Sequence, residues 1–376
     1  MESFLLASKT ILSNLSAYQK IRIVLGNGTC DLDSAVSALA QGFFEYLDAM
    51  KNSLTNLAVI PVMNIPEREY RVKTEVVFFL KQHNIPARLL TFRDQIDLKA
   101  LKEKDGIDLE IVLVDHHHLT EEDTYLADSV VKVIDHRPQD ANWPWPGRMV
   151  RLESVGSCAT LVARNLIDKY PEAIDTQLSS LLRGPILIDT SNFSKEADRA
   201  TSVDVEVVRD LERLGQLDLD KKKVFDEIVQ AKSDISELTV DDFLIRDLKV
   251  TAGIPIVGLP ILIGKYLEMP DVFDAMKNFA KSQNTTLLVL IGLEIRSEQI
   301  HRDIAIFSFS TDPLRDEIVQ VLTTTKPSLE LTLVKEINHE DGNCNLLLYS
   351  QGNLRLTRKQ ILPLIRDTVT AARSRC

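Results

Sequence analysis

Carboxylate and imidazole side chains follow four apolar segments of this sequence, at the point where each segment ends. The four stretches are Leu25–Ser34, Val114–His118, Ile134–Pro138 and Ile188–Asn192. Carboxylates that converge in one place repel one another unless cations neutralise them, and burying them unpaired is prohibitive. Mixed carboxylate and imidazole ligands suit Mn²⁺ or Mg²⁺ better than Zn²⁺. The pattern therefore predicts two divalent cations, which together support in-line displacement at phosphorus.

Each of these residues has a simpler explanation when it is taken alone. An aspartate at the end of a strand is a good N-cap for the next helix, and Asp33 before a helix at Ser34 fits that role. His83, His301 and His339 stand alone in the sequence and are left outside the predicted site. The metal hypothesis rests on clustering, because four of the seven histidines fall between residues 116 and 136.

The segments that must position these side chains alternate between strand-like and helix-like patterns. Apolar runs rich in Val and Ile predict buried strands, and the run from about Ser34 to Met50 predicts a helix. The predicted strands are Ile21–Leu25, Leu57–Val62, Arg88–Phe92, Leu109–Asp115, Val130–Asp135 and Pro185–Asp189. This alternation predicts an α/β fold with a doubly wound, mostly parallel sheet that carries helices on both faces. Ligands of such sheets bind at the carboxyl ends of the strands, where the polar residues fall.

A second, smaller α/β domain is expected after a polar segment. Residues 215–223 are charged and include a lysine triplet, which predicts a linker between a first domain at residues 1–214 and a second at residues 224–376. The second domain is expected to contain a mixed sheet and a closing helix. Its predicted strands are Ile254–Ile263, Thr286–Glu294, Ile304–Ser310, Glu330–Glu336 and Asn345–Ser350, and the predicted closing helix is Arg358–Ala372.

The balance of charge and the cysteines limit the classes of partner and compartment. The 376 residues include 44 Lys and Arg against 55 Asp and Glu, a net charge of −11, which disfavours a general nucleic-acid surface. No uncharged apolar run approaches ~20 residues, so no membrane span is predicted. Four cysteines that lie far apart are typical of an intracellular protein with reduced thiols. The cytoplasm is the expected compartment. A mitochondrial presequence at residues 3–22, which hold three cations and no acid, is the alternative to an amphipathic first helix.

Six stretches of the chain resemble one known superfamily. They are LGNGTCDLDSAVSALA, FRDQIDLKAL, IVLVDHHHL, VIDHRP, ESVGSCATLV and TRKQILPLI, and they extend over essentially the whole chain. Their order is similar to that of the DHH phosphoesterases, in the pyrophosphatase and exopolyphosphatase branch, with the closest resemblance to the animal prune proteins. The Asp-His-Arg form at residues 135–137 is specific for prune. The resemblance implies an enzyme, a metal-dependent phosphoric anhydride hydrolase.

The resemblance also implies a role for each residue of the predicted metal site. Asp31 would bind one ion and Asp33 the other, while Asp115 would bridge both. His136 and Asp189 would complete the shell of the second ion. The catalytic residues that it implies are Asp115, His136 and Arg137.

Two departures from the pyrophosphatase pattern change the expected chemistry. Asn27 stands where the pyrophosphatases have a histidine ligand, and an amide oxygen is a weaker ligand, so the first ion is expected to bind less tightly. Arg137 replaces the second histidine of the third motif. An arginine forks onto phosphate oxygens but cannot transfer a proton, which predicts slow turnover.

Basic residues of the second domain resemble the phosphate-binding residues of this branch. Lys249 resembles one substrate contact, and Arg358 with Lys359 resembles the other. Without the resemblance, the basic pair would be read as the start of an exposed helix. Together with Arg137, these side chains are expected to bind the phosphate chain, helped by free N–H groups at the start of the last helix.

The resemblance implies hydrolysis of short-chain inorganic polyphosphate or nucleoside polyphosphates by metal-activated water. One alternative is a cyclic-nucleotide (cAMP or cGMP) phosphodiesterase that uses the same site. Another is a regulatory protein of low activity that acts by binding nucleoside diphosphate kinase. The oligonucleotide-degrading branch of the superfamily is disfavoured, because its Gly-rich, histidine-containing motif is absent from the sequence.

Overall fold

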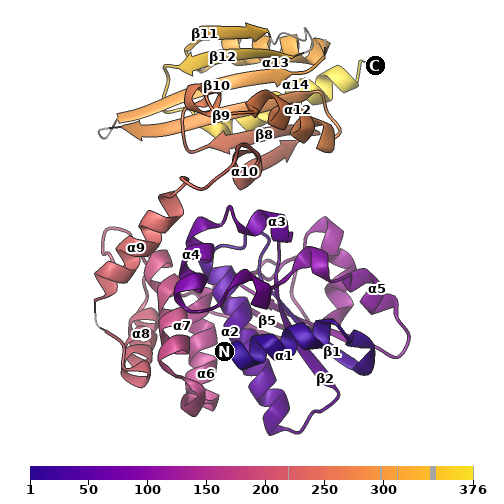
Figure 1. Ribbon diagram of the computed structural model, residues 1–376, viewed down its shortest axis with the longest axis vertical. Coiled ribbons are helices and arrows are strands. Elements are labelled where there is room, and N and C mark those ends of the chain that lie inside the picture. The colour runs from indigo at the N-terminus through magenta and orange to yellow at the C-terminus, as the bar shows by residue number, and fades with distance from the viewer. Residues whose placement is uncertain (219, 297–298, 311, 339–343, 376) are drawn as a thin grey trace. The chain divides into compact units, whose positions relative to one another are not determined.

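The computed structural model describes residues 1–218, 220–296, 299–310, 312–338 and 344–375. These residues form two compact units, Met1–Ile235 and Ser236–Cys376 (Figure 1). The sequence predicts a boundary at residues 215–223, whereas the units divide twelve residues later. The reason is helix α9 (Lys221–Ser233), which packs against α4 (Thr74–Gln82) and α7 (Thr176–Asp189) of the first unit.

The first unit contains a six-stranded sheet in which every neighbouring pair is parallel. The strand order is β3-β2-β1-β4-β5-β6. The strands are β1 (Lys20–Leu25), β2 (Leu57–Met63), β3 (Thr91–Phe92), β4 (Asp108–Val114), β5 (Val130–Asp135) and β6 (Met149–Leu152). The order reverses between β1 and β4, so the crevice that binds ligands in such sheets opens at the carboxyl ends of these two strands. The doubly wound fold is confirmed.

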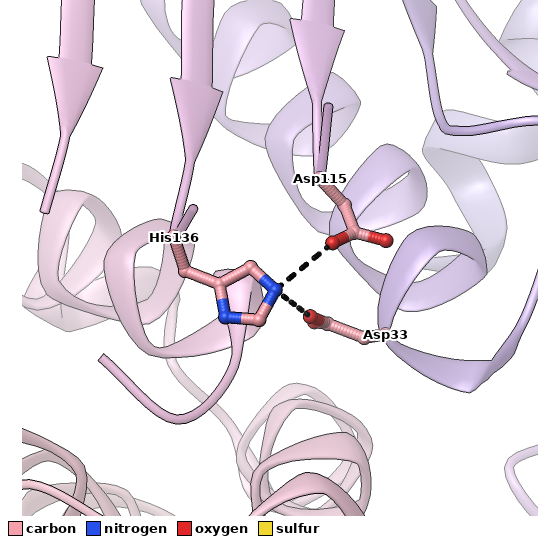
Figure 2. A group of neighbouring side chains, drawn as sticks. All are labelled: Asp33, Asp115 and His136. Carbon is pink, nitrogen blue, oxygen red and sulfur yellow. Dashed lines mark ion pairs between the residues drawn. The ribbon is translucent and has the colours of Figure 1, made fainter. Parts of the chain in front are cut away.

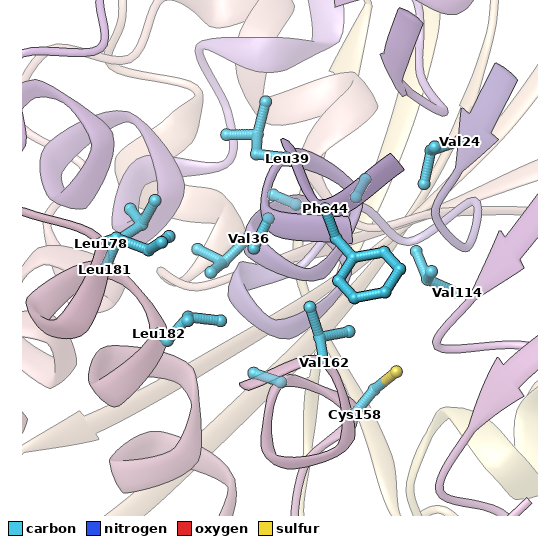
Figure 3. Packing of buried hydrophobic residues seen from close by; sticks show 14 of the residues in the cluster. Val24, Val36, Leu39, Phe44, Val114, Cys158, Val162, Leu178, Leu181 and Leu182 are labelled. Carbon is cyan, nitrogen blue, oxygen red and sulfur yellow. The ribbon is translucent and has the colours of Figure 1, made fainter. Parts of the chain in front are cut away.

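Helices cover both faces of this sheet. One hydrophobic cluster joins the sheet to the helices α1, α2, α4, α6, α7 and α8, and a second joins it to α5 and the 3₁₀ segment Glu121–Ser129. Figure 3 shows part of the first cluster, in which Val24 and Val114 of the sheet share a core with Val36 and Leu39 of α2. The helices not yet given bounds are α1 (Glu2–Leu12), α2 (Leu32–Lys51), α3 (Glu67–Tyr70), α5 (Leu98–Glu103), α6 (Cys158–Lys169) and α8 (Ser202–Gly215).

The segment Pro185–Asp189 was predicted as a strand, and this prediction is wrong, because the segment is the last turn of α7. The buried residues Leu178, Leu181, Leu182 and Pro185 recur every three to four positions, which is the period of a helix. The predicted strand Arg88–Phe92 is reduced to the two residues of β3.

Helix α8 is fastened to the first unit by one buried carboxylate. Asp204 accepts hydrogen bonds from the N–H of Gly156 (2.9 Å), from the Thr201 hydroxyl (2.7 Å) and from the Thr160 hydroxyl (2.6 Å). These bonds connect the start of α8 to α6 and to the loop before it. The N–H of Thr201 also donates to Asp204 (2.8 Å). Asp204 is fully buried, so its removal leaves four donors without their acceptor.

We expect Asp204→Ala to lower the free energy of unfolding by about 3 kcal/mol, since it leaves buried donors unsatisfied and removes a helix cap. Urea unfolding followed by circular dichroism measures the change. Asp210→Ala on the same helix is the control. Its carboxylate makes an exposed ion pair with Arg213, so we expect a change below about 0.5 kcal/mol. Equal effects of the two substitutions would contradict the role of Asp204.

The second unit contains a six-stranded mixed sheet of order β11-β12-β10-β9-β8-β7, in which only β8 and β9 pair in parallel. Its strands are β7 (Leu248–Thr251), β8 (Ile254–Leu259), β9 (Leu287–Arg296), β10 (Gln299–Ser308), β11 (Leu331–Asn338) and β12 (Asn345–Gln351). Helices α13 (Pro313–Thr324) and α14 (Arg358–Arg373) share a core cluster with one face of the sheet. The remaining helices are α10 (Val240–Arg246), α11 (Ile263–Tyr266) and α12 (Val272–Ser282). The predicted mixed sheet is confirmed.

Within the described residues, every helix is too short or too polar to cross a lipid bilayer. Cys30, Cys158 and Cys344 are buried and form no disulfide, while Cys376 lies outside the described residues.

Candidate metal centre

Two carboxylates and one imidazole meet at the carboxyl edge of the first sheet. Asp33 lies in the first turn of α2, Asp115 follows β4, and His136 follows β5 (Figure 2). Each offers one ligand atom, and these atoms lie within 4.8 Å of one another. His136 Nε2 is 3.3 Å from Asp115 Oδ1 and 4.0 Å from Asp33 Oδ2. Three residues far apart in the sequence therefore present their ligand atoms to one point.

The backbone at Asp115 turns its carboxylate over the sheet edge. Its φ is +59°, a left-handed conformation that is uncommon except in Gly, Asn and Asp. The Asp115 N–H still donates to Ile134 O (2.9 Å), so the pairing of β4 with β5 continues to this residue. The Asn27 amide donates to the other carboxylate oxygen, Oδ2. The carboxylate is thus held while Oδ1 faces His136.

The carboxylate of Asp33 is fixed by the N-terminus of a second helix. It accepts hydrogen bonds from the N–H groups of Cys158 (2.7 Å) and Ala159 (2.8 Å), which begin α6. Free N–H groups and the helix dipole favour a negative charge at this position. Asp33 is 4% exposed, so these two hydrogen bonds take the place of hydrogen bonds to water.

Asp31 is the N-cap of α2, and its Oδ1 accepts from the N–H of Ser34 (3.1 Å). The loop before it needs Gly26, because a Cβ there would lie 2.3 Å from the Ser34 hydroxyl. Asp31 therefore starts the helix that carries Asp33, but it is not among the three residues whose ligand atoms meet.

Asp189 ends α7 and is not among the three residues whose ligand atoms meet. Its Oδ2 is buried without a hydrogen-bond partner. Burial, followed by the charges of Asp33 and Asp31, raises the pKa of Asp189 to about 9. An orphaned buried carboxylate oxygen surrounded by other carboxylates is a position that a cation would satisfy.

The pKa values show how unfavourable the site is without a cation. Burial and then the charge of Asp33 raise the pKa of Asp115 to about 7, and burial also raises the pKa of Asp33. Burial alone would lower the pKa of His136, but its hydrogen bond to Asp115 and the charge of Asp33 outweigh burial and raise it to about 9. The carboxylates draw positive charge to this point. Their oxygen atoms with one imidazole nitrogen fit a divalent cation.

The orientation of His136 suits a metal ligand. Its Nδ1 lies 3.1 Å from the carbonyl oxygen of Val155, so Nδ1 carries the proton and donates it there. Nε2 faces the carboxylates, and its raised pKa means that it carries a proton there in the absence of a cation. A bound cation would take the place of that proton, and Nε2 would then be its ligand. A backbone carbonyl that fixes the ring in this way is the usual support of a metal-binding histidine.

Asn27 is held differently from a ligand. Its amide oxygen accepts from the N–H groups of Thr29 (2.9 Å) and Cys30 (3.2 Å), and its amide nitrogen faces Asp115. In this orientation Asn27 supports the loop and Asp115 rather than offering its oxygen to an ion.

Arg137 places a permanent cation at the rim of the site. Its Nη2 is 3.7 Å from Asp115 Oδ1, and 44% of its side chain is exposed. The guanidinium can therefore contact a bound anion from solvent.

Two residues that the sequence did not assign to the site lie beside it. The Ser157 hydroxyl, buried without a hydrogen bond of ordinary geometry, lowers the pKa values of Asp33 and Asp189. The His117 ring bonds Asp135, whose Oδ1 accepts from the N–H of His136 (2.8 Å). A serine within a Gly-Ser-Cys segment and one histidine of three carry no distinguishing signal in the sequence.

In the second unit, Arg358 bonds the residue that directly precedes strand β7, and Lys249 lies on that strand. Arg358 donates to the Asp247 carbonyl oxygen (2.9 Å) and to Asp247 Oδ1 (2.7 Å), two residues before Lys249. Gly258 makes room for it, because a Cβ there would lie 3.0 Å from Arg358 Nη1. Lys249 and Lys359 are exposed, and Lys359 lies in the first turn of α14. Arg358 thus lies beside strand β7, where Asp247 pairs with its guanidinium.

Comparison with known proteins supports a relationship over most of the chain. A family model described as the DHHA2 domain matches residues 226–368. The Mus musculus protein named exopolyphosphatase PRUNE1 is 36% identical over 358 residues, which cover 93% of this chain and 76% of the mouse protein. A putative exopolyphosphatase of Schizosaccharomyces pombe is 28% identical over 380 residues, 96% of this chain and 94% of that protein. A manganese-dependent inorganic pyrophosphatase of Methanothrix thermoacetophila is 23% identical over 283 residues, 73% of this chain and 82% of that protein.

Proposed function

Because the chain belongs to the prune branch of the DHH phosphoesterase superfamily, we propose that it hydrolyses the phosphoanhydride bonds of short inorganic polyphosphates at the centre formed by Asp33, Asp115 and His136. The observation that carries the proposal is the convergence of these three ligand atoms at the carboxyl edge of the sheet, beside the orphaned oxygen of Asp189. Relatives named exopolyphosphatase and inorganic pyrophosphatase support this reaction class.

Two divalent cations, Mn²⁺ or Mg²⁺, are the cofactors that we propose. Asp33, Asp115 and His136 would bind them, with Asp31 and Asp189 completing their shells. When bound, such ions polarise a phosphoryl oxygen and lower the pKa of an attacking water. The manganese-dependent pyrophosphatase among the relatives supports this assignment.

Asp115, His136 and Arg137 would each have a different role in the reaction. Asp115 would help to hold the ions, since its Oδ1 lies 3.3 Å from Nε2 of His136. The carbonyl of Val155 keeps the proton of His136 on Nδ1, so Nε2 stays available as a ligand. Arg137 would bind phosphate oxygens but cannot donate a proton to the leaving group, because a guanidinium stays protonated. Slow turnover is the consequence.

Lys249, Arg358 and Lys359 of the second unit would bind phosphates of the substrate. Arg358 is oriented by Asp247 and offers a planar fork that matches a phosphate, while the two lysines act as point charges. The relatives named exopolyphosphatase favour a phosphate chain as the substrate. We therefore propose tripolyphosphate and tetrapolyphosphate, or nucleoside polyphosphates, as the substrate class.

Two assays test the proposal, each run with Mg²⁺ and with Mn²⁺: phosphate release from pyrophosphate, tripolyphosphate and tetrapolyphosphate, and formation of AMP from cAMP. We expect metal-dependent release from the two longer polyphosphates and slower release from pyrophosphate. Hydrolysis of cAMP alone would favour the cyclic-nucleotide alternative. Absence of metal-dependent release from every phosphoanhydride would overturn the proposed function, and binding to nucleoside diphosphate kinase would then be the activity to test.

Adding Mn²⁺ to chelator-treated protein is expected to raise its Tm by about 5–10 °C at a concentration of about 100 times Kd, because ligand binding to the folded state alone contributes about 2.7 kcal/mol. Differential scanning fluorimetry measures the shift. Asp33→Asn is expected to lose most of it, while Asp168→Asn, which changes an exposed aspartate of α6, is expected to keep it. An unchanged shift in Asp33→Asn would place the ion elsewhere.

A further inference from the structure

His117 joins the two loops that carry Asp115 and His136. It lies two residues after Asp115 on the loop that follows β4, and it is 3% exposed. Its Nδ1 lies 2.5 Å from Asp135 Oδ2, and its Nε2 accepts from the N–H of Asp140 (3.0 Å). Because Nε2 is an acceptor, the ring proton is on Nδ1 and is donated to Asp135.

The residues that His117 holds belong to the loop between β5 and β6, which carries His136 and Arg137. Asp135 ends β5 directly before this loop, and its Oδ1 accepts from the N–H groups of His136 (2.8 Å) and Arg137 (3.4 Å). Asp135 is fully buried, so both of its oxygens depend on these partners. Asp135 therefore fixes the backbone of His136 and Arg137, whose side chains lie near Asp115. His117 in turn fixes the carboxylate of Asp135.

A third hydrogen bond joins His117 to the part of the β5–β6 loop that lies nearest β6. The Trp145 indole N–H donates to the His117 carbonyl oxygen (2.7 Å), and Trp145 is buried and stacks on Trp143 at 5.3 Å between ring centroids. His117 thus holds the loop at its start, its middle and its end. The neighbouring His118 is exposed and has none of these bonds.

We propose that His117 is a positioning residue that sets the distance between Asp115 on one loop and His136 with Arg137 on the other, acting through the Nδ1–H bond to Asp135. The inference rests on the proposed function only for its activity readout. It does not require His117 to contact a metal ion or the substrate.

Two conservative substitutions separate the two ring bonds. Asparagine places an amide N–H near the position of Nδ1, so His117→Asn can keep the bond to Asp135 and lose the bond to Asp140. Glutamine places its amide near the position of Nε2, so His117→Gln can keep the bond to Asp140 and lose the bond to Asp135. His118→Ala is the matched control.

The test measures the affinity for Mn²⁺ by calorimetry, and kcat and KM with tripolyphosphate. We expect His117→Gln to lose about 10- to 100-fold in Mn²⁺ affinity or in kcat/KM, the range typical of residues that support metal ligands. His117→Asn is expected to stay within about threefold of wild type, and His118→Ala to be unchanged. Wild-type values for His117→Gln, or equal losses in the Asn and Gln variants, would overturn the inference.

If His117→Gln does not fold, Asp135→Asn provides the same information, and it is expected to reduce Mn²⁺ affinity by a similar factor. If wild type releases no phosphate from any phosphoanhydride, the proposed function fails, and Mn²⁺ affinity alone then decides the role of His117.

Discussion

Asp115→Asn is expected to lower metal-dependent phosphate release from tripolyphosphate by at least about 1000-fold, which corresponds to about 4 kcal/mol of transition-state stabilisation. Asp115 is the residue on which the site converges: Nε2 of His136 lies 3.3 Å from its Oδ1, and the Arg137 guanidinium lies 3.7 Å from the same atom. Asparagine keeps the shape of the side chain but removes the charge that would attract two cations. The rate with saturating Mn²⁺ measures the effect.

The same substitution is expected to stabilise the protein in the absence of metal. Burial and the charge of Asp33 raise the pKa of Asp115 to about 7, so the ionised form is unfavourable in the folded state. Removing that charge relieves the repulsion, and Tm in chelator should rise even as activity is lost. Asp168→Asn, on the surface of α6, should change neither quantity. Retained activity in Asp115→Asn would contradict the assignment of the metal centre.

Arg358→Ala is expected to raise KM for tripolyphosphate by about 10- to 100-fold while kcat falls less, because a charge-assisted, two-pronged contact to phosphate contributes about 1.5–3 kcal/mol. Arg358→Lys should recover only part of the loss, since a lysine cannot reproduce the fork. Steady-state kinetics with tripolyphosphate measures both constants.

The control for Arg358 is Arg366→Ala on the same helix. Arg366 is exposed and pairs with its neighbour Asp367, so it shares the helix and the charge but not the position beside Asp247. We expect KM to stay within about twofold of wild type, as for an exposed pair of low energy. Equal KM values for the two variants would show that Arg358 does not bind the substrate.

The parallel sheet and part of the site could be predicted because their signals are local. Strands β1, β4 and β5 each contain a buried apolar run near their carboxyl ends, and residues of the site follow each strand. The helix at Pro185–Asp189 could not be separated from a strand, because a short apolar run fits both periods and the buried leucines that decide it lie further back in α7.

The supporting bonds of the site depend on tertiary contacts that the sequence does not display. Asp135 is bonded by His117, which lies eighteen residues earlier. The amide of Asn27 is a ligand in one orientation and a donor to Asp115 in the other. The division between the units is set by the packing of α9 on α4 and α7, and the charge of residues 215–223 gives no sign of that packing.

The most direct test of the metal centre is a crystal structure of the protein with Mn²⁺. Diffraction data collected at a wavelength where manganese scatters anomalously locate the ions in an anomalous difference map. The account predicts two manganese peaks about 3.5–4 Å apart, bound by Asp33, Asp115 and His136, with Asp31 and Asp189 in contact. A single peak, or peaks bound by residues outside this set, would contradict it.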